Sequence, residues 1–195
     1  FLPYNCDIYS LAPLFRAYVF IDAHEGTFVT EHPIIHHTDV AASGSSLYNG
    51  TVNFTADDAG SNYRLRQKAM GNGVETYSLN NGTNYRNATD ITSNSTFFNS
   101  DDTGVQAHWG AEQTYQYFLE KHGRSSYDGN GAVIKSYVHY ATNYVNAFWD
   151  GSRMTYGDGD GETYGPLVSL DIVGHELAHG VTQFSADLIY RNESG

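Results

Sequence analysis

The sequence is poor in cysteine and in basic residues. Its single cysteine, Cys6, excludes an internal disulfide and a metal site built on paired cysteines, and no neighbouring base would activate it as a nucleophile. The sequence contains 10 Lys and Arg residues and 22 Asp and Glu residues, which gives a net charge of −12. Because phosphate groups bind basic surfaces, so acidic a chain predicts no nucleic-acid partner.

Long hydrophobic runs are also missing. The best apolar candidate, residues 11–21, is interrupted by Arg16 and falls short of the roughly 20 residues of a membrane helix, so we expect no membrane partner. The N-terminus lacks the basic segment, apolar segment and cleavage site of a signal peptide. We therefore expect the chain to begin after any signal peptide, or to be a fragment.

The composition nevertheless favours a folded protein. Of the 195 residues, 40% are apolar and only 16% are charged, and the chain contains 16 Tyr, 10 Phe and 2 Trp. This supply of aromatic side chains argues against disorder, and a chain of this length buries roughly two-thirds of its unfolded surface. The length suits one domain, or one domain with a piece of another.

The N-terminal part of the sequence combines strand and linker signals. Residues 16–22 and 27–30 predict two strands joined by a turn. His36 and His37 precede a run of small residues at 41–46, and this composition predicts a linker. Two adjacent histidines on an extended segment point to opposite sides, which disfavours a metal site there.

The remainder of the sequence predicts an α+β fold with a β-rich N-terminal lobe. Residues 47–101 carry β-branched and aromatic residues between glycine-containing turns, as expected for a strongly twisted antiparallel sheet of hairpins. Apolar residues at helical spacing predict two long helices, at 102–121 and 167–185. Between these helices we expect a strand at 132–140 and a loop at 151–165.

The second long helix contains a metal-binding pattern, His175-Glu176-Leu177-Ala178-His179. Two histidines four residues apart emerge on the same helix face, about 6 Å from each other, and can bind one zinc ion. Glu176 lies about 100° around the helix from His175, near the metal but angled away from direct ligation. That position suits it to take a proton from metal-activated water.

Chance does not explain this motif, because a shuffled chain of the same composition would contain about 0.02 copies. Its apolar surroundings also disfavour histidines that merely meet solvent, since unpaired ionisable groups on a half-buried helix are costly. A longer motif with a third histidine is absent, because Thr182 and Ser185 occupy its glycine and histidine positions. The third ligand must lie further along, where Asp187 is too close to the helix and Glu193 is a marginal candidate.

Further signatures surround the motif, and over about residues 45–195 the chain resembles the thermolysin family of secreted zinc metalloendopeptidases. The active-site helix and the segment after it carry most of the resemblance. The segments that match are 122–129, 137–140, 146–149, 151–154, 156–161, 171–182 and 188–195.

The resemblance implies roles beyond the zinc motif. Tyr190 matches a tyrosine that helps to stabilise the tetrahedral intermediate, although a packed aromatic is the simpler interpretation of the residue alone. Asn146 and Ala147 match the edge strand that holds the substrate backbone by β-strand addition. Asp171, one turn before His175, matches a carboxylate of a calcium cluster, so Zn²⁺ and Ca²⁺ are both implied cofactors.

The resemblance also implies that the chain is incomplete. The family's third zinc ligand is a glutamate that would fall about four residues beyond Gly195, which makes Glu193 the wrong carboxylate. The helical C-terminal domain, with a second catalytic histidine, would follow as a partner of this chain. Residues 1–40 resemble the end of a propeptide with a linker, and 41–195 the N-terminal peptidase domain.

The leading interpretation is a secreted, extracellular zinc endopeptidase, made as a zymogen, that hydrolyses protein and peptide substrates. On its own we expect this chain to be nearly inactive. One alternative is a non-catalytic, propeptide-like binding or chaperone module with a vestigial metal site. Another is a structural metal site closed by four protein ligands.

Overall fold

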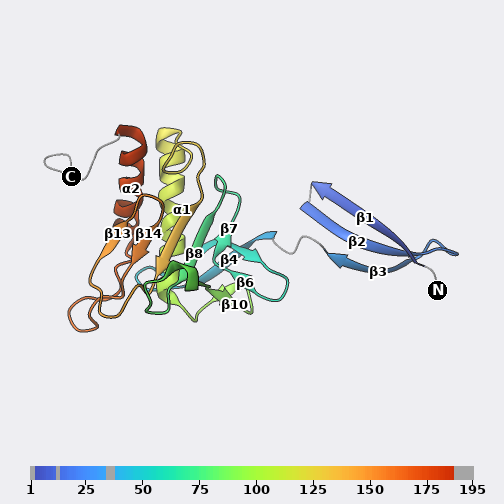
Figure 1. Ribbon diagram of the computed structural model, residues 1–195, viewed down its shortest axis with the longest axis horizontal. Coiled ribbons are helices and arrows are strands. Elements are labelled where there is room, and N and C mark those ends of the chain that lie inside the picture. Colours follow the sequence, from blue (N-terminus) through green and yellow to red (C-terminus); the bar gives the residue numbers. More distant parts are fainter. Residues whose placement is uncertain (1–2, 12–13, 34–37, 187–195) are drawn as a thin grey trace.

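The computed structural model describes residues 3–11, 14–33 and 38–186. Its strands form three sheets, and two long helices pack together on the larger body (Figure 1), which confirms the β-rich α+β class. The first sheet is antiparallel and confirms the two N-terminal strands and their turn. Its strands are β1 (Pro3–Leu11), β2 (Leu14–Asp22) and β3 (Phe28–Pro33), of which β1 was not predicted.

The linker predicted at 41–46 is wrong, because these residues form a strand. Strand β4 (Thr38–Ser46) pairs along its whole length with the antiparallel β5 (Gly50–Asp58). Small residues are required there by close packing. A Cβ atom added at Gly44 would lie 2.7 Å from the carbonyl oxygen of Phe98 on the neighbouring strand.

The remaining strands are short and complete the second and third sheets. They are β6 (Tyr63–Arg64), β7 (Arg66–Gln67), β8 (Val74–Ser78), β9 (Thr89–Asp90), β10 (Thr92–Ser93), β11 (Phe97–Phe98), β12 (Ile134–Val138), β13 (Ala147–Trp149) and β14 (Met154–Tyr156), with a 3₁₀ turn at Tyr85–Asn87. Strand β12 confirms the strand predicted at 132–140, whereas β14 lies inside the predicted loop 151–165.

The two larger sheets are mixed rather than purely antiparallel. The second has the order β10-β6-β5-β4-β11, and β11 runs parallel to β4. The third has the order β13-β14-β12-β8-β7, with β9 paired to β8, and β12 runs parallel to both of its neighbours. Parallel neighbours need a long crossover connection, which a local hairpin pattern does not reveal.

Both predicted helices are present. Helix α1 (Asp102–His122) begins after Asp101, whose carboxylate accepts the backbone N–H of Gly104 at 2.7 Å. It ends at Gly123, which adopts the left-handed conformation. Helix α2 (Leu170–Ala186) lies beside α1 in Figure 1, and neither helix is long and apolar enough to cross a membrane.

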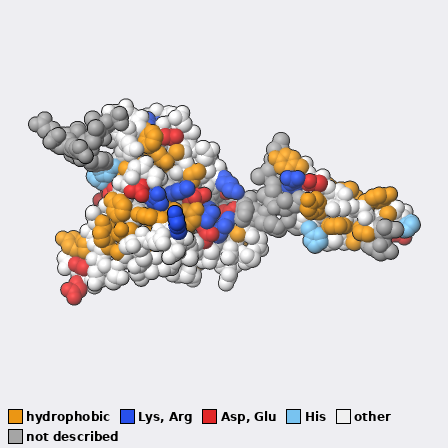
Figure 2. Space-filling model, viewed as in Figure 1, with side chains coloured by type: hydrophobic (Ala, Val, Ile, Leu, Met, Phe, Trp, Pro, Cys, Tyr) orange, Lys and Arg blue, Asp and Glu red, His pale blue; other side chains and the backbone are white. Residues whose placement is uncertain are grey.

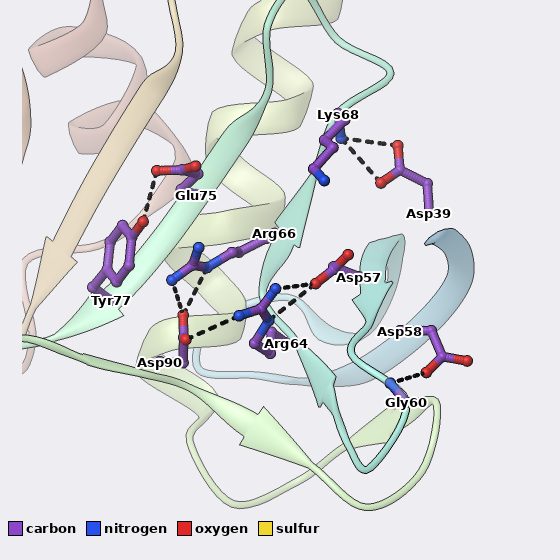
Figure 3. A network of polar contacts seen from close by, with 10 residues as sticks. All are labelled: Asp39, Asp57, Asp58, Gly60, Arg64, Arg66, Lys68, Glu75, Tyr77 and Asp90. Carbon is purple, nitrogen blue, oxygen red and sulfur yellow. Dashed lines mark hydrogen bonds and ion pairs between the residues drawn. The ribbon is translucent and has the colours of Figure 1, made fainter. Parts of the chain in front are cut away.

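Ion pairs join the second and third sheets (Figure 3). Arg64 of β6 pairs with Asp57 of β5 at 2.5 Å and with Asp90 of β9 at 3.4 Å. Arg66 of β7 donates to the same Asp90 carboxylate at 2.7 Å. Basic side chains therefore lie among acidic ones on the face shown in Figure 2, so the local charge is compensated there.

His139 connects three segments that are distant in sequence. It follows β12, and its ring lies between the cap of α1, Asp101, at 3.1 Å and Asp158 at 2.8 Å. Burial by itself would lower the pKa of His139. Hydrogen bonds and charge from the two carboxylates outweigh burial and raise the pKa of His139 to about 10.

We expect Gly44→Ala to lower the free energy of unfolding by about 1–3 kcal/mol, because the added methyl group would overlap the neighbouring strand. Ser45→Ala, on the same strand, is the control and should change stability by less than about 0.5 kcal/mol. Denaturant unfolding of both variants measures the difference. Equal effects of the two substitutions would contradict close packing at Gly44.

We also expect His139→Gln to lower stability by roughly 2 kcal/mol at pH 6. Because the folded-state pKa is raised, the stabilisation is complete below the unfolded value of about 6.5 and is lost as the pH rises through about 10. The difference in the free energy of unfolding between wild type and His139→Gln, measured at pH 6, 8 and 10.5, should become smaller as the pH rises. His122→Gln, at the exposed end of α1, is the control, and a difference that stays constant over this range would refute the assignment.

Candidate active site

Helix α2 presents the zinc motif at the surface of the larger body. Val173 and Leu177 are fully buried and fix the rotation of the helix, which leaves His175 exposed and His179 half-buried. The two imidazole rings lie 4.5 Å apart between centroids. Together with Glu176, they bring one ligand atom each within 4.8 Å of one another. This donor set, two imidazoles beside a carboxylate, fits a zinc ion.

The electrostatic surroundings suit these roles. Burial raises the pKa of Glu176, while the charge of His175 and a backbone hydrogen bond with Trp149 oppose that rise. Burial, followed by the charge of His175, lowers the pKa of His179. A lowered pKa keeps the imidazole neutral at neutral pH, and only the neutral ring has a lone pair for a metal.

Strand β13 is the last strand of the third sheet, and no other strand of the described residues pairs with its outer edge. The carbonyl of Asn146 accepts the N–H of Gly157 at 3.0 Å, toward β14. Because backbone groups alternate along an antiparallel strand, those of Ala147 and Trp149 point to the unpaired side. Ala147 lines one cavity together with His175 and Glu176, so this side faces α2.

A cavity of about 400 Å³ lies between the strand edge and the helix. The structure thereby brings together five residues predicted from the sequence, namely Asn146, Ala147, Asp171, His175 and Glu176, with Leu167 and Ile172 completing the lining. A larger cavity of about 540 Å³ lies between α1 and α2, but no histidine lines it, so we place the chemistry in the smaller one.

Other predicted site residues are not brought into the metal-binding group. Asp171 is exposed, and its carboxylate accepts the hydroxyl of Ser169 at 2.5 Å, which lowers the pKa of Asp171. Within residues 3–11, 14–33 and 38–186, the group of His175, Glu176 and His179 does not include Asp171. Tyr190 and Glu193 lie outside the described residues.

Sequence reasoning missed the contacts that attach β13 to α2. The indole Nε1 of Trp149 donates to the Oε1 of Gln183 at 2.8 Å. A Cβ atom added at Gly180 would lie 3.0 Å from Tyr127 and 3.1 Å from Trp149. Two residues in the sequence could have indicated these contacts. They are Gly180, which directly follows His179, and Gln183, which lies one helical turn after His179.

Comparison with known proteins gives matches over most of the chain. Residues 41–183 match the family model for the thermolysin metallopeptidase catalytic domain. Bacillolysin from Brevibacillus brevis is 47% identical over 177 residues, which cover 90% of this chain and 33% of that protein. The transglutaminase-activating metalloprotease from Streptomyces mobaraensis is 41% identical over 160 residues, covering 78% of this chain and 20% of that protein.

A solved structure agrees with these matches. The precursor of protealysin, a metalloproteinase from Serratia proteamaculans, superposes with a TM-score of 0.56 at 35% identity, covering 63% of this chain and 38% of that one. The chain spans about a third or less of the curated relatives named above. The matched region contains the zinc motif and the edge strand, and the chain therefore belongs to the thermolysin family of zinc-dependent metallopeptidases.

Proposed function

We propose that this chain is the N-terminal portion of a secreted zinc endopeptidase that hydrolyses peptide bonds in proteins and peptides. The observation that carries the proposal is the placement of the zinc motif beside a free strand edge, with a cavity between them. An edge strand can hold a peptide backbone, while the motif supplies the hydrolytic groups.

In this proposal His175 and His179 hold the metal. Bound zinc would polarise the peptide carbonyl and lower the pKa of water toward 7. Two histidines leave room for a third protein ligand, which we expect after Gly195 from the family resemblance. The closeness of the donor atoms and the neutral state of His179 support this assignment.

Glu176 is the general base in this proposal. It is 6% exposed, and its raised pKa brings it closer to the range in which a carboxylate accepts a proton in one step and donates it in the next. Glu176 lines the same cavity as Ala147 of β13, beside His175. Glu176 would take the proton of the attacking water and pass it to the leaving amine.

Substrate would bind as an added strand along β13. The outward-pointing backbone N–H and C=O of Ala147 are the matching partners for an extended peptide. The exposed side chain of Asn146 lies at the same end of the strand and lines the cavity. Backbone pairing favours an endopeptidase, because it accepts many sequences and leaves selectivity to side-chain pockets.

The remaining roles follow the family resemblance. Tyr190 would stabilise the tetrahedral intermediate, and Asp171 would bind calcium with ligands from further along the chain. Residues 1–40 would be the end of a propeptide and linker, and 41–195 the peptidase domain. We expect the protein's own C-terminal helical domain to cover exposed apolar side chains of the two helices, which are Tyr117, Leu119, Leu170 and Phe184.

We expect Glu176→Gln to reduce kcat for peptide hydrolysis by about 10²–10⁴-fold in the complete protein, because the amide cannot accept the proton. Zinc content should stay unchanged. Glu120→Gln, an exposed position on α1, is the matched control and should be fully active. Hydrolysis that persists in Glu176→Gln would contradict the assigned base, and a wild-type protein that binds zinc without hydrolysis would favour a binding or structural role.

We expect His179→Gln to weaken zinc binding by roughly 100-fold, because one of the nitrogen donors is lost. Equilibrium dialysis of the complete protein measures the affinity. His122→Gln removes an exposed histidine of α1 and serves as the control. Equal affinities in the two variants would exclude His179 as a ligand.

A further inference from the structure

Gln183 lies on the same face of α2 as the two histidines, because positions 175, 179 and 183 follow one another at four-residue steps. Its side-chain oxygen accepts the indole N–H of Trp149 at 2.8 Å. An indole is a donor only, so a partly buried tryptophan needs such an acceptor. The helix face that carries the metal motif therefore also carries the acceptor for the edge strand.

Packing brings the Trp149 ring close to the helix backbone. A side chain at Gly180 would lie 3.1 Å from the indole, and the ring of Tyr127 lies 4.8 Å from that of Trp149. The Gln183 amide also lies against the β13–β14 turn, since a Cβ at Gly151 would be 3.8 Å from its oxygen. The indole of Trp149 is thus held between the backbone of α2 and the side-chain amide of Gln183.

Trp149 contacts α2 at two positions. Its indole nitrogen donates to Gln183, and its ring packs against Gly180. These helix positions are three residues apart, about one turn of the helix. The hydrogen bond and the ring packing together hold β13 against α2.

We propose that Gln183 is a positioning residue that sets, through Trp149, the place of a bound peptide relative to Glu176 and the zinc motif. The inference rests on the proposed peptidase function and names the residue that fixes the geometry of that site. Gln183 does not line the 400 Å³ cavity and acts only through the strand. A displacement of about 1 Å in such a site costs up to about 100-fold in rate.

The decisive variant is Gln183→Met, which retains side-chain length but has no oxygen acceptor. In the complete zinc-bound protein we expect kcat to fall about tenfold while KM changes less than about twofold, because the backbone pairing along β13 persists. Gln183→Glu keeps an oxygen acceptor and should restore kcat to within about threefold of wild type. Gln116→Met, an exposed position on α1, is the control and should change neither constant.

Trp149 fluorescence gives a readout independent of activity. In a background in which Trp109 and any tryptophan outside residues 1–195 are replaced by Phe, Trp149 is the sole tryptophan. Gln183→Met should then increase the quenching of Trp149 by acrylamide, whereas Gln183→Glu should not. Trp149→Phe removes the indole N–H that donates to Gln183, so it should lower kcat as Gln183→Met does. If Gln183 acts through Trp149, the loss of kcat in the double variant should be no larger than the greater single loss.

The outcomes separate the two proposals. The positioning role would be overturned by an unchanged kcat in Gln183→Met, or by losses of kcat that add in the double variant. Hydrolysis by the wild-type protein would still support the peptidase function in either case. A wild-type protein without hydrolysis would overturn both. If Gln183→Met does not fold, the Trp149→Phe variant tests the proposal instead. A loss of kcat in Trp149→Phe supports the positioning role of Gln183, and an unchanged kcat refutes it.

Discussion

The contact between α2 and the edge strand β13 is the constraint on which the site depends. The helix alone supplies two histidines and a glutamate at a fixed spacing, but it has no means of holding an extended peptide. The strand has unpaired backbone groups but no acid, base or metal ligand among Ala147, Phe148 and Trp149. Their contact, made by Trp149 and permitted by Gly180, places His175, Glu176 and the edge of β13 around one cavity.

Several acidic residues connect segments of the structure that are distant in the sequence. Asp90 joins the second and third sheets through its ion pair with Arg64, and Asp101 both caps α1 and holds the charged ring of His139. Asp160 accepts three backbone N–H groups, from residues 162, 163 and 164, and so forms the tight turn expected of its glycine-rich loop. Each of these carboxylates has hydrogen-bond or ion-pair partners, and such partners offset the cost of burying a polar group.

Prediction from the sequence succeeded where the signal is local. Helix α1 was expected at 102–121 and spans Asp102–His122, because a capping acid and a terminal glycine mark its ends. It failed for the small-residue run at 41–46, which has the composition of a linker. The small size of these residues is explained by the close approach of β11, which pairs with β4.

The sequence by itself determined the grouping of the potential metal-binding side chains. Four-residue spacing on an apolar helix places His175, Glu176 and His179 near one another in any environment, because helix geometry is local. Tertiary structure alone decided that β13 is an edge strand, that β12 has parallel neighbours, and that Gln183 meets Trp149 across 34 residues of chain. Such contacts arise from the packing of distant segments, and neither periodicity nor composition encodes which segments will meet.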